Sequence, residues 1–100
     1  MPKSKPPSDE KQRRETAGKF LKGIREAQGV TQRQVAEAVG IEVYTVISQY
    51  EAGHGKLPTD IWPAYAEAIG MQQEFFAKKL LEAYMPEIFS MLYINTGDFR

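Results

Sequence analysis

The sequence predicts an all-α protein, and three observations support that fold class. Apolar residues recur at helical spacing along most of the 100 residues, and no long stretch alternates apolar and polar residues as a strand would. No Asn-Gly or Asp-Gly pair joins two apolar runs, so the usual β-hairpin signal is missing. Glycine closes four successive apolar segments, at Gly29, Gly40, Gly53 and Gly70, where helices commonly end. We therefore expect five helices and a C-terminal helical extension.

The composition is that of a folded protein with few chemical options beyond binding. Hydrophobic residues make up 42% of the chain, and 13 basic residues balance 13 acidic ones, which excludes a protein that coats nucleic acid by bulk charge. Cysteine is absent and histidine occurs once, so we expect no metal and no cofactor. No apolar run approaches the roughly 20 residues of a membrane span, and no signal peptide is visible. We expect no membrane contact and a cytoplasmic location.

Charge is distributed unevenly along the chain although its sum is zero. Residues 1–16 contain three prolines, few apolar side chains, and five basic residues against three acidic ones. Such a segment buries too little surface to offset the entropy of ordering it, so we predict a flexible basic arm that joins the first helix near residues 11–15. Residues 59–100 carry three basic and six acidic residues, so the back of the chain is negative.

Residues 17–70 are expected to hold the first four helices. The first has an apolar face at positions i, i+1, i+4 and i+7, which consists of Phe20, Leu21, Ile24 and Ala27. The second helix is predicted at residues 31–39, where Thr31 is an N-cap and Gln34 completes a capping box. Its inner face is formed by Val35, Ala36 and Val39.

The third helix is short and is predicted at residues 43–52, with the apolar residues Val43, Val46, Ile47 and Tyr50. Residues 54–58 form a loop by composition. The fourth helix begins at Thr59 or Asp60, and Pro63 is tolerated because the first turn of a helix has no intrahelical N–H partners to lose. Its apolar face consists of Ile61, Trp62, Tyr65, Ala66 and Ile69.

The C-terminal segment, residues 71–94, is predicted to form a fifth helix at residues 72–84 and a further turn or two after Pro86, with a tail at residues 95–100. Its aromatic and methionine content exceeds what the back of one small domain needs. Because such residues are enriched in interfaces, we predict that the surplus forms a dimer contact. The residues assigned to it are Phe75, Phe76, Leu80, Tyr84, Ile88, Phe89 and Leu92. Folding of the segment back over its own subunit is the alternative.

Residues 29–53 resemble the helix-turn-helix of the lambda-repressor-like family, the Cro/CI-type or XRE transcriptional regulators. The matching parts are Gly29-Val30-Thr31-Gln32, Val35-Ala36, Val39-Gly40 and Ile47-Ser48-Gln49-Tyr50-Glu51-Ala52-Gly53. The resemblance extends over residues 17–70 and implies a five-helix DNA-binding fold whose third helix enters the major groove. The positions that determine the structure of the motif are then Ala36, Gly40, Ile47, Tyr50, Glu51 and Gly53.

The turn between the second and third helices is one residue longer than the commonest pattern of that family. An ungapped match would place Gln49 in a core position. One extra residue among positions 41–43 instead directs Ile47 and Tyr50 inward. This second register satisfies burial, and we predict it.

In that register the outward face of the third helix consists of Tyr44, Thr45, Ser48 and Gln49, with Val46 at its border. Glutamine can bond adenine N6 and N7 as a bidentate pair, and threonine or valine can contact the thymine methyl group. Because this helix contains no arginine, strong guanine readout from it is not expected, and the composition favours half-sites that contain A·T pairs.

Phosphate contacts are expected from the N-terminus of the second helix, where backbone N–H groups and the helix dipole favour anions. Gln32 and Arg33 stand there, and the resemblance favours Gln32 as the backbone clamp. His54 and Lys56 follow the third helix and are further candidates, as are Arg13 and Arg14 of the basic arm.

These observations predict a sequence-specific regulator that binds double-stranded DNA as a homodimer and reads a palindromic operator, with repression by occlusion as its simplest action. Contact with RNA polymerase through an acidic helix face would allow activation. No constellation of catalytic side chains stands out, so we expect no enzyme. One alternative is an antitoxin or small operon autoregulator that also masks a toxin or other partner protein. Another is a protein-interaction adaptor that no longer reads DNA.

Overall fold

The computed structural model describes residues 8–94, and within them every regular element is helical, which confirms the predicted all-α class. The helices are α1 (Ser8–Ala27), α2 (Gln32–Val39), α3 (Thr45–Ala52), α4 (Trp62–Ala68), α5 (Gln73–Tyr84) and α6 (Pro86–Phe89). A 3-10 turn, η1 (Thr59–Ile61), leads into α4, and a π-helical turn, η2 (Ser90–Ile94), follows α6. The first seven residues of the predicted arm and the predicted tail lie outside the described residues.

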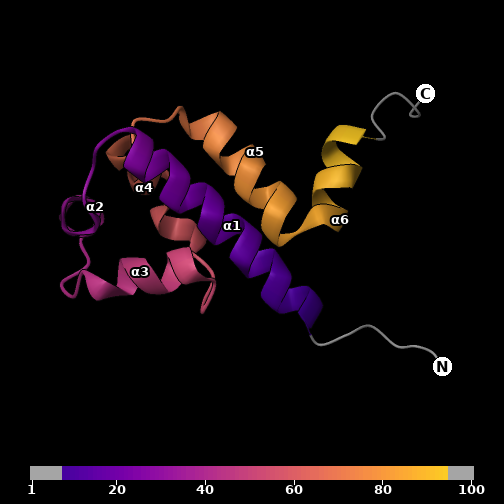
Figure 1. The fold of residues 1–100 in the computed structure, drawn as a ribbon. Helices are drawn as coiled ribbons and strands as arrows, with labels where there is room; N and C mark the ends of the chain where they lie inside the picture. Colours follow the sequence, from indigo (N-terminus) through magenta and orange to yellow (C-terminus); the bar gives the residue numbers. More distant parts are fainter. Residues whose placement is uncertain (1–7, 95–100) are drawn as a thin grey trace.

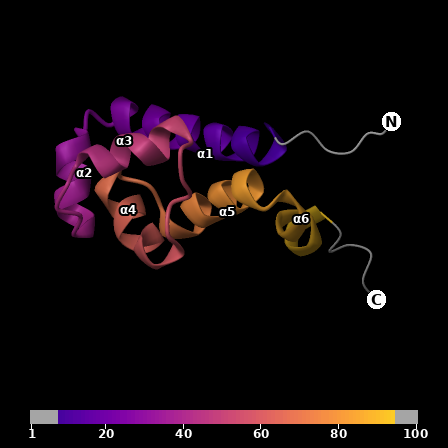
Figure 2. The ribbon, with the colours of Figure 1, turned by 90° about the horizontal axis from the view of Figure 1, so that it is seen from below.

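Helix α1 is the central element of the domain. It crosses the molecule diagonally, with α3 along one side and α5 along the other (Figure 1). In the perpendicular view α2 lies at one end of the molecule and α6 at the opposite end (Figure 2). The core between the helices is made of fully buried side chains, chiefly Leu21, Val35, Ile47, Leu57, Tyr65, Ile69, Phe76 and Leu80.

The first helix begins earlier than predicted, at Ser8 rather than near residues 11–15, so the expectation of a flexible arm over residues 8–10 is wrong. Asp9 and Glu10 lie in the first turn, where acidic side chains favour the positive end of the helix dipole. Arg14 also donates from Nε to the carbonyl oxygen of Gly53 at 2.9 Å, so this half of the helix is held by a contact far along the chain. At the other end of α1, Ala27 is exposed and does not belong to the buried face that the spacing predicted.

Three of the predicted dimer residues, Phe76, Leu80 and Tyr84, are buried in the core of their own subunit, so that part of the prediction is wrong. The aromatic ring of Phe76 lies 5.9 Å from that of Tyr65 and 6.2 Å from that of Phe20, measured between ring centroids. The Tyr84 hydroxyl accepts a hydrogen bond from the backbone N–H of Leu57 at 3.0 Å. Helix α5 therefore completes the same core as residues 17–70.

Two glycines let the backbones of α1 and α3 come into direct contact. A Cβ atom on Gly18 would lie 2.2 Å from the carbonyl oxygen of Glu51. Gly53 has a φ of +82°, and a Cβ atom there would lie 2.8 Å from the backbone nitrogen of Glu15. Neither position accepts a larger residue without moving one helix, so the end of α3 is fixed against α1 by backbone contact.

Candidate nucleic-acid interface

The N-terminus of α2 has the predicted capping box. The Thr31 hydroxyl accepts a hydrogen bond from the backbone N–H of Gln34 at 3.0 Å, and the Gln34 side chain accepts one from the Thr31 N–H at 2.9 Å. Gly40 ends the helix with a φ of 80°, which supports its predicted role in the turn. These caps fix where α2 begins and ends, and therefore which residues stand at its N-terminus.

Helix α3 follows the register with the longer turn. Ile47 is fully buried and Gln49 is exposed, as that register predicts. The helix begins at Thr45 rather than at residue 43, so Val43 lies in the preceding turn and its side chain is 59% exposed. The extra residue is accommodated in the turn before Tyr44, where the chain has not yet entered the helix.

A buried hydrogen-bond network connects α1, α2 and α3. Arg25 donates to both carboxylate oxygens of Glu51, from Nε at 2.6 Å and from Nη2 at 3.2 Å, and its Nη1 donates to the carbonyl oxygen of Val30 at 2.8 Å. The Gln32 side chain donates to the same carboxylate at 3.0 Å. The hydrogen bonds to Glu51 raise the pKa of Arg25 above its ordinary value, against the opposing effect of its burial. The network fixes Gln32 relative to α3.

Glu51 was predicted to have a structural role, whereas its partner Arg25 was missed. Arg25 lies 26 residues before Glu51 in the sequence. An arginine on the buried side of α1, four residues after Leu21, is the one sequence signal that could have found it, since a charge there needs a partner.

The predicted base-reading residues differ in how freely they can reach DNA. Thr45 and Gln49 are exposed, while Val46 and Ser48 are half-buried. The Ser48 hydroxyl donates to the carbonyl oxygen of Thr45 at 2.6 Å, so its hydrogen is already engaged. The Gln49 side-chain oxygen lies 3.0 Å from Nδ1 of the exposed His54, within hydrogen-bond distance. The outward face of α3 carries no charge, because its one charged residue, Glu51, is buried.

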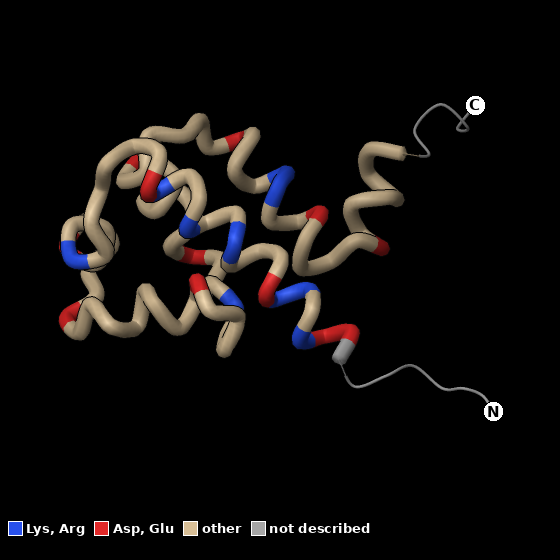
Figure 3. The backbone as a smooth tube through the Cα atoms, in the orientation of Figure 1, with Lys and Arg blue, Asp and Glu red and all other residues tan. Residues whose placement is uncertain are grey.

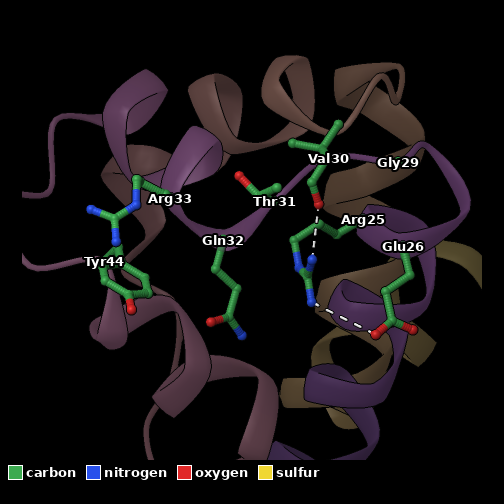
Figure 4. A pocket seen from close by; sticks show the side chains of 8 residues that line it. All are labelled: Arg25, Glu26, Gly29, Val30, Thr31, Gln32, Arg33 and Tyr44. Carbon is green, nitrogen blue, oxygen red and sulfur yellow. Dashed lines mark hydrogen bonds and ion pairs between the residues drawn. The ribbon is translucent and has the colours of Figure 1, made fainter.

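An open concavity of about 730 Å³ lies beside the N-terminus of α2. It is lined by Arg25, Glu26, Gly29, Val30, Thr31, Gln32, Arg33 and Tyr44 (Figure 4). Gln32 and Arg33, the two predicted phosphate residues of α2, are thus brought together with Tyr44, which directly precedes α3. The Arg33 guanidinium lies over the Tyr44 ring, 4.2 Å from its centroid.

The other predicted phosphate residues have partners elsewhere in the chain. Arg13 forms an ion pair with Glu87 of α6 at 3.0 Å, and Arg14 contacts Glu10 at 3.6 Å in addition to the Gly53 carbonyl. Lys56 lies 3.7 Å from the same Glu10 carboxylate. Along α1, basic and acidic residues alternate rather than form one positive surface (Figure 3). These three residues belong to the N-terminal half of α1 and the loop after α3, away from the N-terminus of α2.

The core is all-α, and two short helices, α2 and α3, are joined by a turn at a glycine. The second of them exposes a neutral polar face. These features define a helix-turn-helix domain. A family model described as a helix-turn-helix domain matches residues 12–77 of this chain. The chain therefore belongs to the helix-turn-helix domain family, of the Cro-like type, and its domain is a DNA-binding one. A comparison with curated proteins found no match. Among the helices of residues 8–94, none is long and apolar enough to cross a membrane.

Proposed function

We propose that this protein is a sequence-specific transcriptional regulator that binds an operator through α3 and acts by binding rather than by catalysis. The observation that carries the proposal is the buried Arg25–Glu51–Gln32 network. It holds the open N-terminus of α2 at a fixed position beside the exposed residues of α3, as a protein must when it contacts backbone and base edges together.

The exposed residues of α3 have the chemistry for reading A·T pairs. Gln49 can donate to adenine N7 and accept from N6. Its side-chain oxygen lies within hydrogen-bond distance of His54 Nδ1, and this contact orients the amide in the absence of DNA. The methyl group of Thr45 suits the thymine methyl. Gln32 and the free N–H groups of the first turn of α2 supply phosphate contacts, with Lys56 and His54 as further donors beyond α3.

We further propose that two copies associate through the apolar surface of α6 and η2. Its exposed large apolar side chains are Ile88 at 41%, Tyr93 at 42%, Leu92 at 51%, Met91 at 59% and Ile94 at 65%. The Arg13–Glu87 ion pair and the Lys78 ammonium, 4.8 Å from the centre of the Tyr93 ring, hold this surface against α1 and α5. A two-fold dimer of this kind would read half-sites about 34 Å apart on a palindromic operator. Such occupancy represses a promoter by occlusion, in the cytoplasm where bacterial DNA is found.

The same apolar surface favours a second candidate function, that of an antitoxin or operon autoregulator. In that case a partner protein, rather than a second copy, covers Met91, Leu92 and Ile94. The two candidates differ in what the purified chain does alone. A regulator that dimerises by itself sediments as a dimer, whereas the antitoxin requires its partner to bury the surface.

Selection from a randomised duplex pool at about 0.15 M salt tests the proposal. We expect an enriched palindrome, and we expect the double variant Thr45→Ala, Gln49→Ala to lose it while remaining folded. Lys22→Gln is the matched control, because Lys22 is an exposed residue of α1 outside the proposed interface. A folded wild-type protein that enriches no sequence would contradict DNA readout and favour the adaptor.

A further inference from the structure

Arg33 differs from the other arginines of the described chain in having no hydrogen-bonding partner. Arg13 is paired with Glu87, Arg14 with Glu10 and the Gly53 carbonyl, and Arg25 with Glu51. Arg33 is exposed, and within residues 8–94 its guanidinium contacts the face of the Tyr44 ring. All five N–H donors of its guanidinium are therefore available to a ligand.

The Tyr44 ring fixes the plane of this guanidinium. The 4.2 Å separation is well within the range of a cation–π contact, and Tyr44 itself is half-buried and packed against the core. Figure 4 shows the guanidinium lying over the ring, with the rest of the Arg33 side chain descending from α2. A stacked arginine has already lost much of its rotamer freedom, so less entropy is lost when its edge binds a ligand.

The surroundings of the stack favour a neutral acceptor over a phosphate. Arg33 and Tyr44 line the concavity at the N-terminus of α2 and also a smaller one of about 140 Å³ on its other side. The first is bordered by Glu26, and the second by Glu37 and Glu42. Glu37 and Glu42 disfavour a phosphate on the side of the smaller concavity, whereas the O6 and N7 atoms of guanine carry no net charge.

We propose that Arg33 reads a guanine in each half-site, from α2 and on the Tyr44 ring, by donating two hydrogen bonds to O6 and N7. The inference rests on the proposed DNA-binding function and deepens it. Arginine paired with guanine in this way is the commonest specific contact in the major groove. Helix α3 contains no arginine, but Arg33 of the neighbouring α2 lies beside the start of α3. The operator therefore contains a G·C pair beside the A·T pairs that Thr45 and Gln49 suit.

The test measures base preference, because a phosphate contact would alter only overall affinity. The operator selected by wild-type protein is prepared with each of the four base pairs at every position of the half-site. Binding of each duplex is then measured for wild type, Arg33→Lys, Tyr44→Phe, Tyr44→Leu and the control Lys22→Gln. Thermal unfolding of each variant shows that it is folded.

We expect wild type to prefer guanine at one position by roughly 10-fold or more, as a bidentate pair provides. Arg33→Lys keeps the charge but not the planar fork, and it should reduce that preference to about 3-fold or less while other positions are unchanged. Tyr44→Phe retains the ring and the preference, and Tyr44→Leu loses it together with the stack.

Two results would overturn the inference, and they differ from failure of the proposed function. Arg33→Lys could weaken every duplex by the same factor and leave the base preference intact, which would make Arg33 a phosphate clamp. Alternatively, the selected half-site could contain no guanine whose preference depends on Arg33. If folded wild-type protein selects no sequence at all, DNA readout itself fails and the guanine contact fails with it.

Discussion

Two regions of the molecule differ in which side chains they leave without partners. One is the junction of α1, α2 and α3, and the other is the C-terminal surface of α6 and η2. At the junction, the buried charges of Arg25 and Glu51 are paired with each other, and Gln32 completes the hydrogen bonding. On the α6–η2 surface, large apolar side chains such as Met91 and Ile94 remain more than half exposed. Polar groups are paired inside the subunit, where they fix α2 against α1 and α3. Apolar side chains are left exposed on the α6–η2 surface, where we propose that a second copy binds.

Of the substitutions that test this comparison, removal of the Glu51 carboxylate should change the free energy of unfolding most. Glu51→Ala leaves Arg25 buried without its partner, and we expect a loss of about 3–5 kcal/mol in the free energy of unfolding. Urea denaturation measures it, with Glu37→Ala on the exposed side of α2 as the control. Replacing both partners by apolar residues, Arg25→Met with Glu51→Leu, should recover most of the loss. A single variant within 1 kcal/mol of wild type would contradict the importance of the pair.

Tyr84 lies between the two regions, at the end of α5 directly before the chain leaves the core. Tyr84→Phe removes the acceptor of the Leu57 N–H and leaves that buried donor unpaired. We expect a loss of about 1–3 kcal/mol in the free energy of unfolding. Thermal unfolding is the measurement, and an unchanged midpoint would show that the backbone of Leu57 finds another acceptor.

Tyr65 provides the opposite case, because its buried hydroxyl has no hydrogen-bond partner among the described residues. Tyr65→Phe should therefore raise the free energy of unfolding, by about 1 kcal/mol at neutral pH. Burial also raises the pKa of both Tyr65 and Tyr84 above the ordinary value. The stability from keeping these phenols neutral is complete below a pH of about 10 and is lost as the pH rises through the folded pKa values.

The loss of stability at alkaline pH can be checked with the Tyr65→Phe variant. Denaturation curves recorded at increasing pH should show the free energy of unfolding falling more steeply for wild type than for Tyr65→Phe, which has one fewer buried phenol to ionise. Equal slopes for the two proteins would contradict the assignment to Tyr65.

Charges on the C-terminal surface should have the smallest effect on the fold and a decisive one on assembly. Leu92→Lys with Met91→Lys changes two exposed residues, so the stability of the monomer should shift by about 0.5 kcal/mol or less per residue. Analytical ultracentrifugation should show dimers for wild type and monomers for the variant. Val43→Lys is the control, since Val43 is 59% exposed but lies in the turn before α3. A variant that remains dimeric would move the interface elsewhere.

The parts of the fold that sequence could predict are those encoded by near neighbours. Thr31 and Gln34 stand three positions apart, so their capping box was visible in the sequence and is confirmed. The inward position of Ile47 followed from burial and is also confirmed. By contrast, the first half of α1 is held by Arg14, which donates to the carbonyl oxygen of Gly53, 39 residues later. Arg25 was missed for the same reason, because its partner lies on another helix.

Two further features, one in α5 and one in the candidate site, could not be predicted because they depend on contacts between different helices. Composition marked the aromatic residues of α5 as a surplus, yet Phe76 is enclosed by Phe20 and Tyr65, which only the packed structure reveals. Because α3 contains no arginine, its sequence alone predicted no arginine contact with a DNA base. The stack of Arg33 on Tyr44 brings a residue of α2 onto the residue that precedes α3, and no spacing rule within one helix predicts it.

The glycine contacts between α1 and α3 have a consequence for how such a protein changes its target over evolutionary time. Because the backbones touch at Gly18 and Gly53, α3 has no room to slide or tilt when its outer residues change. Thr45 and Gln49 are exposed and take no part in that contact, so they can be exchanged without repacking the core. If α3 reads the operator as we propose, its specificity can be changed one side chain at a time, by evolution or by design, while the core stays the same.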